Sequence, residues 1–501
     1  MTVVPEIYLG PPGTGKTTKL IGLVEEELAA GTAPDRIGYV SFTKRAAGEA
    51  TERACTRFGL ERRDLPHFRT LHSAAFAALG LSSGDVLEGR RLAEFGDWLG
   101  VPLSEMRLSE DGTLTGYTPG DRALFMENLA RVRGVPLREQ YDMYHDDLPW
   151  SLVERISRGL AEYKRRRHLL DYTDMLAQFA AAEWVPHLDV LFVDEAQDLS
   201  ALQWRVVWRL AQRARRVVVA GDDDQAIYRW AGADVDYFVD LQGDARVLGQ
   251  SWRCPPAVQE LSAEVIGRVS RRRPKAWAPR EGAGEVRRVG RLEEVDLWGE
   301  DVLVLGRNAF VLRDAAEYVR REGVIFEWRG HSSVSQPILE AVRLWEALRR
   351  GEAVTAEEAR RVYEYMSSGQ GVARGYKTLP GLPPAQPVTL AELRATGGLL
   401  RDDIWHEALD RIPAEERAYL IRARQKGETT TGRPRVRLST IHGAKGGEAD
   451  HVVIMRDVAD RTWEEAQINP DDEARVWYVA VTRAKSRVTV VAPQSRASYD
   501  V

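Results

Sequence analysis

The chain has 501 residues, of which 44% are hydrophobic and 29% charged, and its formal net charge is -5 at pH 7. This composition is ordinary for a folded soluble protein and argues against extensive disorder, and the length suggests roughly three or four folding units. No apolar run reaches the ~18 residues needed to cross a bilayer, and the N-terminus lacks a secretory signal, so we expect a cytoplasmic protein with no membrane partner. The net charge does not exclude a nucleic-acid partner, because a local basic channel can coexist with acidic outer faces.

Cysteine and lysine are both scarce. Cys55 and Cys254 are the only cysteines, and they form neither a C-x-x-C pair nor a cluster with histidine, so the sequence supports neither a disulfide framework nor a zinc site. Only nine of the 70 basic residues are lysine. Four of these lysines fall inside or beside the motifs described below, namely Lys16, Lys44, Lys445 and Lys485. Where lysine appears despite such a bias, its compact charge can be needed.

Short β-rich runs alternate with helical spacing along much of the chain. The first run, residues 6–10, leads at once into glycines, and apolar residues then recur at helical spacing from residue 17 to 30. Further β-rich runs occupy residues 37–42, 190–193, 217–220, 302–305, 436–439, 452–455 and 488–491. This alternation predicts parallel sheets covered by helices, in two groups.

Two stretches of different character interrupt these groups. Residues 82–167 are mainly helical and charged, whereas residues 332–431 are helical at first and then rich in proline. We therefore predict an α/β protein with two parallel-sheet cores, each carrying a mainly helical insertion. The first core takes residues 1–81 and 168–245, and the second takes residues 246–331 and 432–501.

The run Gly-Pro-Pro-Gly-Thr-Gly-Lys-Thr at residues 10–17 fits the pattern of a phosphate-binding loop between a strand and a helix. Glycines let backbone N–H groups approach phosphate oxygens, Lys16 can reach the β- and γ-phosphates, and the Thr17 hydroxyl can bind Mg²⁺. The expected nucleotide contacts are Gly10, Gly13, Thr14, Gly15, Lys16, Thr17 and Thr18. An inconsequential glycine-rich turn is the alternative, but the flanking strand and helix favour ATP binding.

Two carboxylates, Asp194 and Glu195, directly follow the buried strand expected at residues 190–193. At the carboxyl edge of a parallel sheet they would face the phosphates, with Asp194 holding the metal and Glu195 acting as general base or orienting the attacking water. Acidic residues also end strands for ordinary reasons of solubility. Together with the glycine-rich loop, however, this pair predicts hydrolysis.

The acidic run at residues 194–198 is followed by Gly-Asp-Asp-Asp-Gln-Ala-Ile-Tyr-Arg-Trp-Ala-Gly at residues 221–232, which resembles the third motif of superfamily 1 helicases of the UvrD/Rep type. The resemblance implies that Gln225 senses the γ-phosphate and that Tyr228 and Trp230 stack on bases of single-stranded DNA. Residues two apart on an extended segment face the same way, and stacking is worth about 1–3 kcal/mol per base. A plain core role for the two aromatic residues is the alternative.

The remaining motifs follow in the order of the family. Residues 41–47 resemble motif Ia and residues 70–73 resemble motif Ib, which implies DNA contacts for Phe42, Thr43 and His72. Phe42 could equally belong to the core. Residues 250–253 resemble motif IV, in which Trp252 would stack on the nucleotide base and Arg253 would reach the γ-phosphate.

Two further motifs lie near the C-terminus. Residues 438–448 resemble motif V, which implies that His442 belongs to the DNA-side network and that Glu448 contacts the ribose. Residues 476–484 resemble motif VI, with Arg483 as an arginine finger. In the family, the two cores are the RecA-like motor domains 1A and 2A, and the insertions at 82–167 and 332–431 take the places of subdomains 1B and 2B in a compact form.

The resemblance implies an ATP- and Mg²⁺-dependent DNA helicase or translocase, whose two cores close on ATP and open again so that hydrolysis drives stepping along single-stranded DNA. We expect a monomer acting at junctions of single- and double-stranded DNA. The acidic run at residues 194–198, which corresponds to motif II, and motifs III, V and VI imply movement from 3′ to 5′, although the loop sequence is closer to that of the 5′ to 3′ branch. The residues before Gly10 include no counterpart of the family's adenine-contacting glutamine, which leaves nucleotide preference open.

Several alternatives stay open at the level of sequence. The same motifs serve a translocase that strips proteins from DNA and unwinds poorly, or a nucleotide-dependent switch that binds DNA without stepping. Stacking does not distinguish RNA from DNA. The pathway served, whether repair, replication, recombination or the replication of a mobile element, cannot be read from these motifs.

Overall fold

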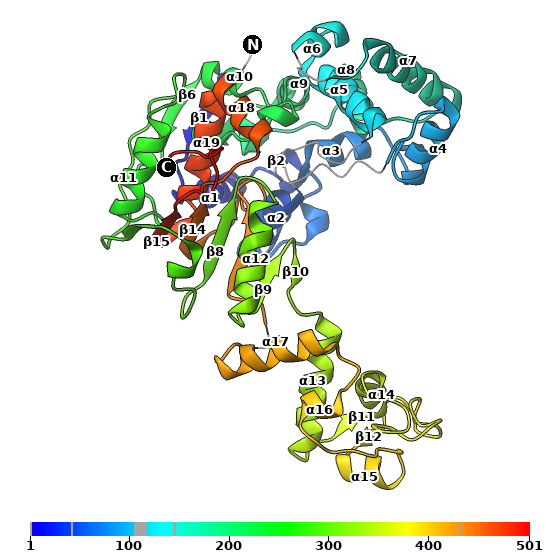
Figure 1. Ribbon diagram of the computed structural model, residues 1–501. Helices are drawn as coiled ribbons and strands as arrows, with labels where there is room; N and C mark the ends of the chain where they lie inside the picture. Colours follow the sequence, from blue (N-terminus) through cyan, green and yellow to red (C-terminus); the bar gives the residue numbers. More distant parts are fainter. Residues whose placement is uncertain (1–2, 42–43, 105–117, 144–146, 430–431) are drawn as a thin grey trace.

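Two sheets form the body of the protein in the computed structural model, which describes residues 3–41, 44–104, 118–143, 147–429 and 432–501 (Figure 1). One sheet comes from the N-terminal half of the chain and the other mainly from the C-terminal half. We call each sheet, with the helices that cover it, the first core and the second core.

The first core contains a six-stranded parallel sheet in the order β3-β2-β4-β5-β1-β6. Its strands are β1 (Glu6–Leu9), β2 (Ile37–Ser41), β3 (Phe68–Thr70), β4 (Val190–Asp194), β5 (Arg216–Gly221) and β6 (Asp244–Val247). Its helices are α1 (Lys16–Ala29), α2 (Lys44–Phe58), α3 (Leu71–Ala78), α8 (Tyr172–Ala181), α9 (Ala201–Leu210) and α10 (Val235–Asp240). The central strands β2 and β4 are buried along their whole length, as expected for a parallel sheet with helices on both faces.

The second core contains a seven-stranded sheet in the order β10-β9-β13-β8-β14-β15-β7, parallel except for the pair β9 and β10. Its strands are β7 (Glu285–Val289), β8 (Val302–Gly306), β9 (Phe326–Trp328), β10 (His331–Ser332), β13 (Val436–Thr440), β14 (Ala449–Met455) and β15 (Ala484–Val491). Its helices are α11 (Pro256–Ile266), α12 (Val311–Arg321), α18 (Asp460–Ile468) and α19 (Pro470–Val481). Helix α19 is buried over most of its length and packs against α11.

Each core carries a mainly helical insertion. The first insertion contains α4 (Arg90–Leu99), α5 (Pro119–Arg133), α6 (Leu137–Met143) and α7 (Trp150–Arg167). The second contains α13 (Gln336–Arg349), α14 (Ala356–Glu364), α15 (Leu390–Ala395), α16 (Trp405–Ala408), α17 (Ala414–Gln425) and a small hairpin of β11 (Val354–Thr355) and β12 (Pro387–Val388). The second insertion extends away from the two sheets (Figure 1) and has its own hydrophobic core around Trp345, Tyr363 and Tyr419.

Short 3-10 helices connect several of these elements, and three of them carry residues of the site described below. They are η1 (Pro34–Arg36), η2 (Arg62–Asp64), η3 (Ser83–Asp85), η4 (Ala196–Asp198), η5 (Ala211–Arg213), η6 (Asp223–Gln225), η7 (Arg229–Ala231) and η8 (Leu292–Glu294).

The predicted fold class is confirmed, with two mainly parallel sheets and helical insertions. Sequence patterns missed the two- and three-residue strands β9, β10, β11 and β12, and they also missed β3, β6 and β7. Strand β3 has only three residues, and β6 and β7 lie at the sheet edges with mostly exposed side chains, so none of the three presents the continuous apolar run of a buried strand. Among the described residues, no helix is both long and apolar enough to cross a membrane.

Candidate functional site

The glycine-rich loop joins β1 to the N-terminus of α1, as predicted. Gly13 and Gly15 adopt left-handed backbone conformations, with φ of 70° and 79°. Lys16 donates a hydrogen bond from Nζ to the carbonyl oxygen of Gly10 at 3.0 Å, and Thr14 Oγ1 donates to the carbonyl of Pro11 at 2.8 Å. Backbone N–H groups at the start of a helix attract anions, so this turn offers a phosphate site.

Asp194, at the carboxyl end of β4, lies directly opposite the loop. Its Oδ2 accepts hydrogen bonds from Thr17 Oγ1 at 3.2 Å and from the hydroxyl of Tyr39 at 2.7 Å. Tyr39 is fully buried on the neighbouring strand β2 and was not predicted as a site residue. Burial, together with the charge of Glu195, raises the pKa of Asp194.

Glu195 follows with a backbone φ of 53°, which is rare for a residue other than glycine and is typical of strained functional positions. Its carboxylate accepts a hydrogen bond from Gln197 Nε2 at 2.6 Å. Although burial favours the neutral form, the charges of Lys16 and Lys445 hold the pKa of Glu195 below its usual value. Glu195 is therefore an ionised acceptor beside the loop.

Gln225, in η6, connects the two cores. Its Nε2 donates to Asp222 Oδ2 at 2.6 Å, and its Oε1 accepts from Nη2 of Arg483 at 2.8 Å. Arg483 follows α19 of the second core and is only 2% exposed. The structure thus brings together two residues, 258 positions apart, that the sequence assigns to the γ-phosphate site.

The segment between β6 and α11 lies directly on the glycine-rich loop. Ser251 Oγ donates to the carbonyl of Pro12 at 2.7 Å, and the backbone N–H of Trp252 donates to the carbonyl of Gly13 at 2.8 Å. The Trp252 side chain is 75% exposed beside this loop, which suits a stacking surface. A Cβ added to Gly13 would lie 2.3 Å from the Cβ of Arg253, so only glycine permits this approach.

Arg253 and Glu448 form an ion pair within the second core. Arg253 Nε lies 2.8 Å from Glu448 Oε2, and Lys485 Nζ lies 3.0 Å from Glu448 Oε1. The predicted γ-phosphate contact and the predicted ribose contact are therefore paired with each other, and Lys485 adds a second positive charge beside Glu448.

Lys445, on the loop after β13, also crosses from the second core to the first. Its Nζ lies 2.5 Å from Asp198 Oδ2 and donates to the carbonyl of Gln225 at 2.8 Å. The same ammonium group lies 4.7 Å from the centre of the Tyr228 ring. One lysine thus contacts both the predicted nucleotide side and the predicted DNA side of the site.

Tyr228, Trp230 and His442 form an aromatic group on the predicted DNA side. The expectation of an extended segment is wrong, because Arg229–Ala231 forms η7 and Gly232, with φ of 101°, closes the turn. The two aromatic rings nevertheless lie 6.4 Å apart, and each lies within 6.3 Å of the His442 ring. Burial holds the pKa of His442 well below its usual value, and the buried Trp230 Nε1 has no hydrogen-bond partner among the described residues.

Of the remaining predicted DNA contacts, the structure describes only His72, which lies in the first core. His72 is in the first turn of α3, and its ring lies 5.9 Å from that of Tyr172, which is half exposed. Burial lowers the pKa of His72 to about 4. Phe42 and Thr43 lie outside the residues that the structure describes.

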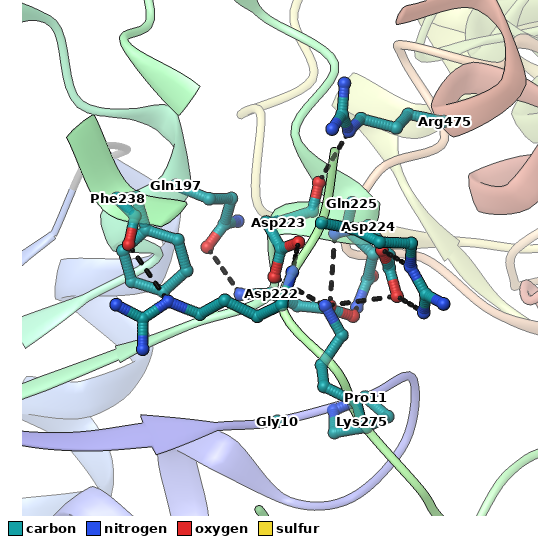
Figure 2. Close-up of polar contacts among 12 residues, drawn as sticks. Gly10, Pro11, Gln197, Asp222, Asp223, Asp224, Gln225, Phe238, Lys275 and Arg475 are labelled. Carbon is teal, nitrogen blue, oxygen red and sulfur yellow. Dashed lines mark hydrogen bonds and ion pairs between the residues drawn. The ribbon is translucent and has the colours of Figure 1, made fainter. Parts of the chain in front are cut away.

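A buried charged network that the sequence did not predict surrounds Lys275 (Figure 2). Its ammonium group lies among Asp222, Asp223 and Asp224, immediately before Gln225. The scarcity of lysine could have drawn attention to Lys275, since it stands at the end of the basic run Arg-Arg-Arg-Pro-Lys.

Comparison with known proteins agrees with this geometry. The model of the UvrD/REP helicase N-terminal domain matches residues 7–246, and that of the UvrD-like helicase C-terminal domain matches residues 414–495. The chain is 24% identical over 257 residues to a putative ATP-dependent DNA helicase, YjcD, of Bacillus subtilis, a match that covers 48% of this chain and 33% of that protein. It is also 24% identical over 339 residues to the ATP-dependent DNA helicase PcrA of Staphylococcus epidermidis, covering 64% of this chain and 43% of PcrA.

The matched region thus spans less than half the length of these relatives. The two family models together cover well over half of this chain and include the glycine-rich loop, both carboxylates, Gln225 and Arg483. The chain belongs to the UvrD/Rep family of superfamily 1 helicases.

Proposed function

We propose that this protein is an ATP-dependent DNA helicase that moves along single-stranded DNA from 3′ to 5′ and couples ATP hydrolysis to unwinding at junctions with duplex. The observation that carries the proposal is the hydrogen bond between Gln225 and Arg483, which connects the phosphate side of the first core to a buried cation of the second. The relatives named above are described as ATP-dependent DNA helicases, in agreement with this activity.

Hydrolysis requires a site for the phosphates and an acceptor for the proton of the attacking water. The loop N–H groups and Lys16 bind the phosphates, and the ionised Glu195 orients the water and takes its proton as the water oxygen bonds to the γ-phosphorus and ADP leaves. Thr17 Oγ1 and Asp194 Oδ2, 3.2 Å apart, are hard oxygen donors that suit Mg²⁺. Mg²⁺ bound there would neutralise phosphate charge.

The charge of the transition state is stabilised from the second core. Arg483 is held by the carbonyl of Val479 at 3.0 Å and by Gln225, so its guanidinium has a defined orientation. When Glu448 binds the ribose in place of Arg253, Arg253 becomes available to contact the γ-phosphate. Such arginine fingers contribute on the order of 10³–10⁵ in rate.

Coupling to DNA follows from the position of Lys445 and the aromatic group. Movement of the second core against the first changes the contacts of Lys445 with Asp198 and Gln225, and the same lysine lies over the ring of Tyr228. Bases stacked on Tyr228 and Trp230 would be released and bound again as the cores open and close. The protein would act as a monomer, since both cores of the site belong to one chain.

The test is steady-state ATP hydrolysis with and without single-stranded DNA, with a Glu195→Gln variant as control. We expect strong stimulation by DNA and a loss on the order of 10²–10⁴ in kcat in the variant. Displacement of a labelled strand from substrates with either a 3′ or a 5′ tail then tests unwinding and polarity.

An ATP hydrolysis rate that is the same with and without single-stranded DNA would instead favour a nucleotide-dependent switch. DNA-stimulated hydrolysis without strand displacement would favour a translocase that strips proteins from DNA. Equal stimulation by single-stranded RNA would contradict the assignment of DNA as substrate.

A further inference from the structure

Three consecutive carboxylates are buried at the start of η6. Asp222, Asp223 and Asp224 are exposed by 0%, 0% and 1%, and their oxygens lie within 4.8 Å of one another. Such a cluster could hold a metal ion, but an ammonium group already occupies the position between the carboxylates (Figure 2). Uncompensated, three buried negative charges would strongly destabilise the fold.

Lys275 supplies this ammonium group. Its Nζ lies 2.5 Å from Asp223 Oδ1, 3.1 Å from Asp224 Oδ2 and 3.2 Å from Asp222 Oδ1, and its side chain is only 1% exposed. Burial opposes the charged form, but the three carboxylates raise the pKa of Lys275 above its usual value. The cluster is therefore a lysine site, and this lysine is charged at neutral pH.

Lys275 reaches the cluster from the side of the second core. It ends a short basic segment, residues 270–275, that follows α11. The segment is attached to the second core at both ends, through Ser270, which bonds Asp471, and through Trp277, which packs on the second core. Arg475 of α19 adds a second connection, donating to the carbonyl of Asp223 at 2.9 Å.

The cluster determines the orientation of the Gln225 side chain. Asp222 Oδ1 pairs with Lys275, while Oδ2 accepts from Gln225 Nε2 at 2.6 Å. An amide has one accepting and one donating end, so an acidic group on one side and Arg483 on the other leave only one orientation for Gln225. In this orientation Oε1 faces the arginine.

We propose that Lys275 is a positioning residue for ATP hydrolysis, which holds Asp222 so that Gln225 presents its amide to Arg483 and to the γ-phosphate. This inference rests on the proposed ATPase activity. Because the basic segment belongs to the second core, Lys275 makes the geometry of the γ-phosphate sensor depend on how the two cores are placed.

A double-mutant cycle tests whether Lys275 acts through Gln225. Lys275→Met alone would leave Asp222 and Asp223 without an ion pair, while Asp224 keeps its pairing with Arg272, and could unfold the protein. The change is therefore made in an Asp223→Asn background, which keeps the charge of the cluster unchanged overall. The kcat and KM for ATP are measured with saturating single-stranded DNA. We expect kcat to fall about tenfold or more relative to Asp223→Asn alone, with KM changed less than about threefold.

The same substitution is then made with Gln225→Ala present. If Lys275 acts through Gln225, replacing Lys275 in this background should change kcat less than about twofold. Equal losses in both backgrounds, or no loss in either, would overturn the proposal. A wild-type protein without DNA-stimulated hydrolysis would overturn the proposed function and the inference together, whereas an active wild type with additive losses overturns the inference alone.

Arg271→Gln is the matched control. Arg271 lies on the same basic segment and pairs with Asp236 at 2.8 Å and Asp240 at 2.5 Å on the first core, but not with the buried carboxylates. We expect its kcat to stay within about twofold of wild type. A loss as large as that of Lys275→Met would mean that attachment of the segment, and not the position of Gln225, limits the rate.

Discussion

The two cores have similar folds but contribute opposite chemistry to the site. The first core contributes the phosphate-binding turn and carboxylates such as Asp194 and Glu195, whereas the second contributes the buried cation Arg483 and the half-buried Lys445. Neither set is complete alone, because the cations of the second core are paired with carboxylates or amides of the first. A site divided in this way can sense whether the cores are closed.

Replacing the buried arginine, Arg483, should reduce ATP hydrolysis more than the other substitutions described here. In Arg483→Ala, the Gln225 side chain loses its hydrogen bond from the second core, and we expect kcat for ATP to fall on the order of 10³-fold, with a smaller change in KM. The measurement is ATP hydrolysis with saturating single-stranded DNA. Thermal unfolding of the variant is the control, since Arg483 is buried; a folded variant with near-normal kcat would contradict the arginine-finger role.

The aromatic group should matter for DNA affinity more than for chemistry. Trp230→Ala removes one stacking surface, so the binding free energy for single-stranded DNA should weaken by about 1–3 kcal/mol. Fluorescence anisotropy of a labelled oligonucleotide measures this change. Trp184→Ala is the matched control, since Trp184 is 66% exposed on the loop between α8 and β4. Equal losses in both variants would count against a specific role for Trp230.

The close approach of the cores at the loop can be blocked by one methyl group. Gly13→Ala places a Cβ against Arg253 and strains a left-handed residue, so kcat/KM for ATP should fall about tenfold. Gly31→Ala separates the two causes, because Gly31 has φ of 90° but nothing within 4 Å of an added Cβ. Gly31→Ala should lose about 1 kcal/mol of stability and little activity. A similar fall of kcat/KM in both variants would refute the steric explanation.

The smallest expected effect concerns communication between the nucleotide and DNA sides. Lys445→Met removes the ion pair with Asp198 and the contact with Tyr228, so stimulation of hydrolysis by DNA should fall about fivefold, with basal hydrolysis less affected. The ratio of rates with and without single-stranded DNA measures this. An unchanged ratio would show that the lysine is only structural.

Much of the fold was predictable because its signals are local. The apolar runs of the central strands, the glycine-rich loop and the carboxylates after β4 can each be recognised within about ten residues, and the structure places them where the pattern predicts. The roles assigned to the site residues remain predictions. The expected extended geometry at Tyr228 and Trp230 was wrong because the segment forms a turn closed by Gly232, and this turn packs on the second core at Tyr228 and on α5 of the first insertion at Gly232.

By itself, the sequence determined the two α/β cores, the phosphate-binding turn and the family. Only the tertiary structure decided which distant residues pair, such as Tyr39 with Asp194, Lys445 with Asp198 and Lys275 with its three carboxylates. The physical reason is that periodicity and motif spacing report on neighbours along the chain. The partner of a buried charge is chosen by the packing of one core against the other, which no local pattern records.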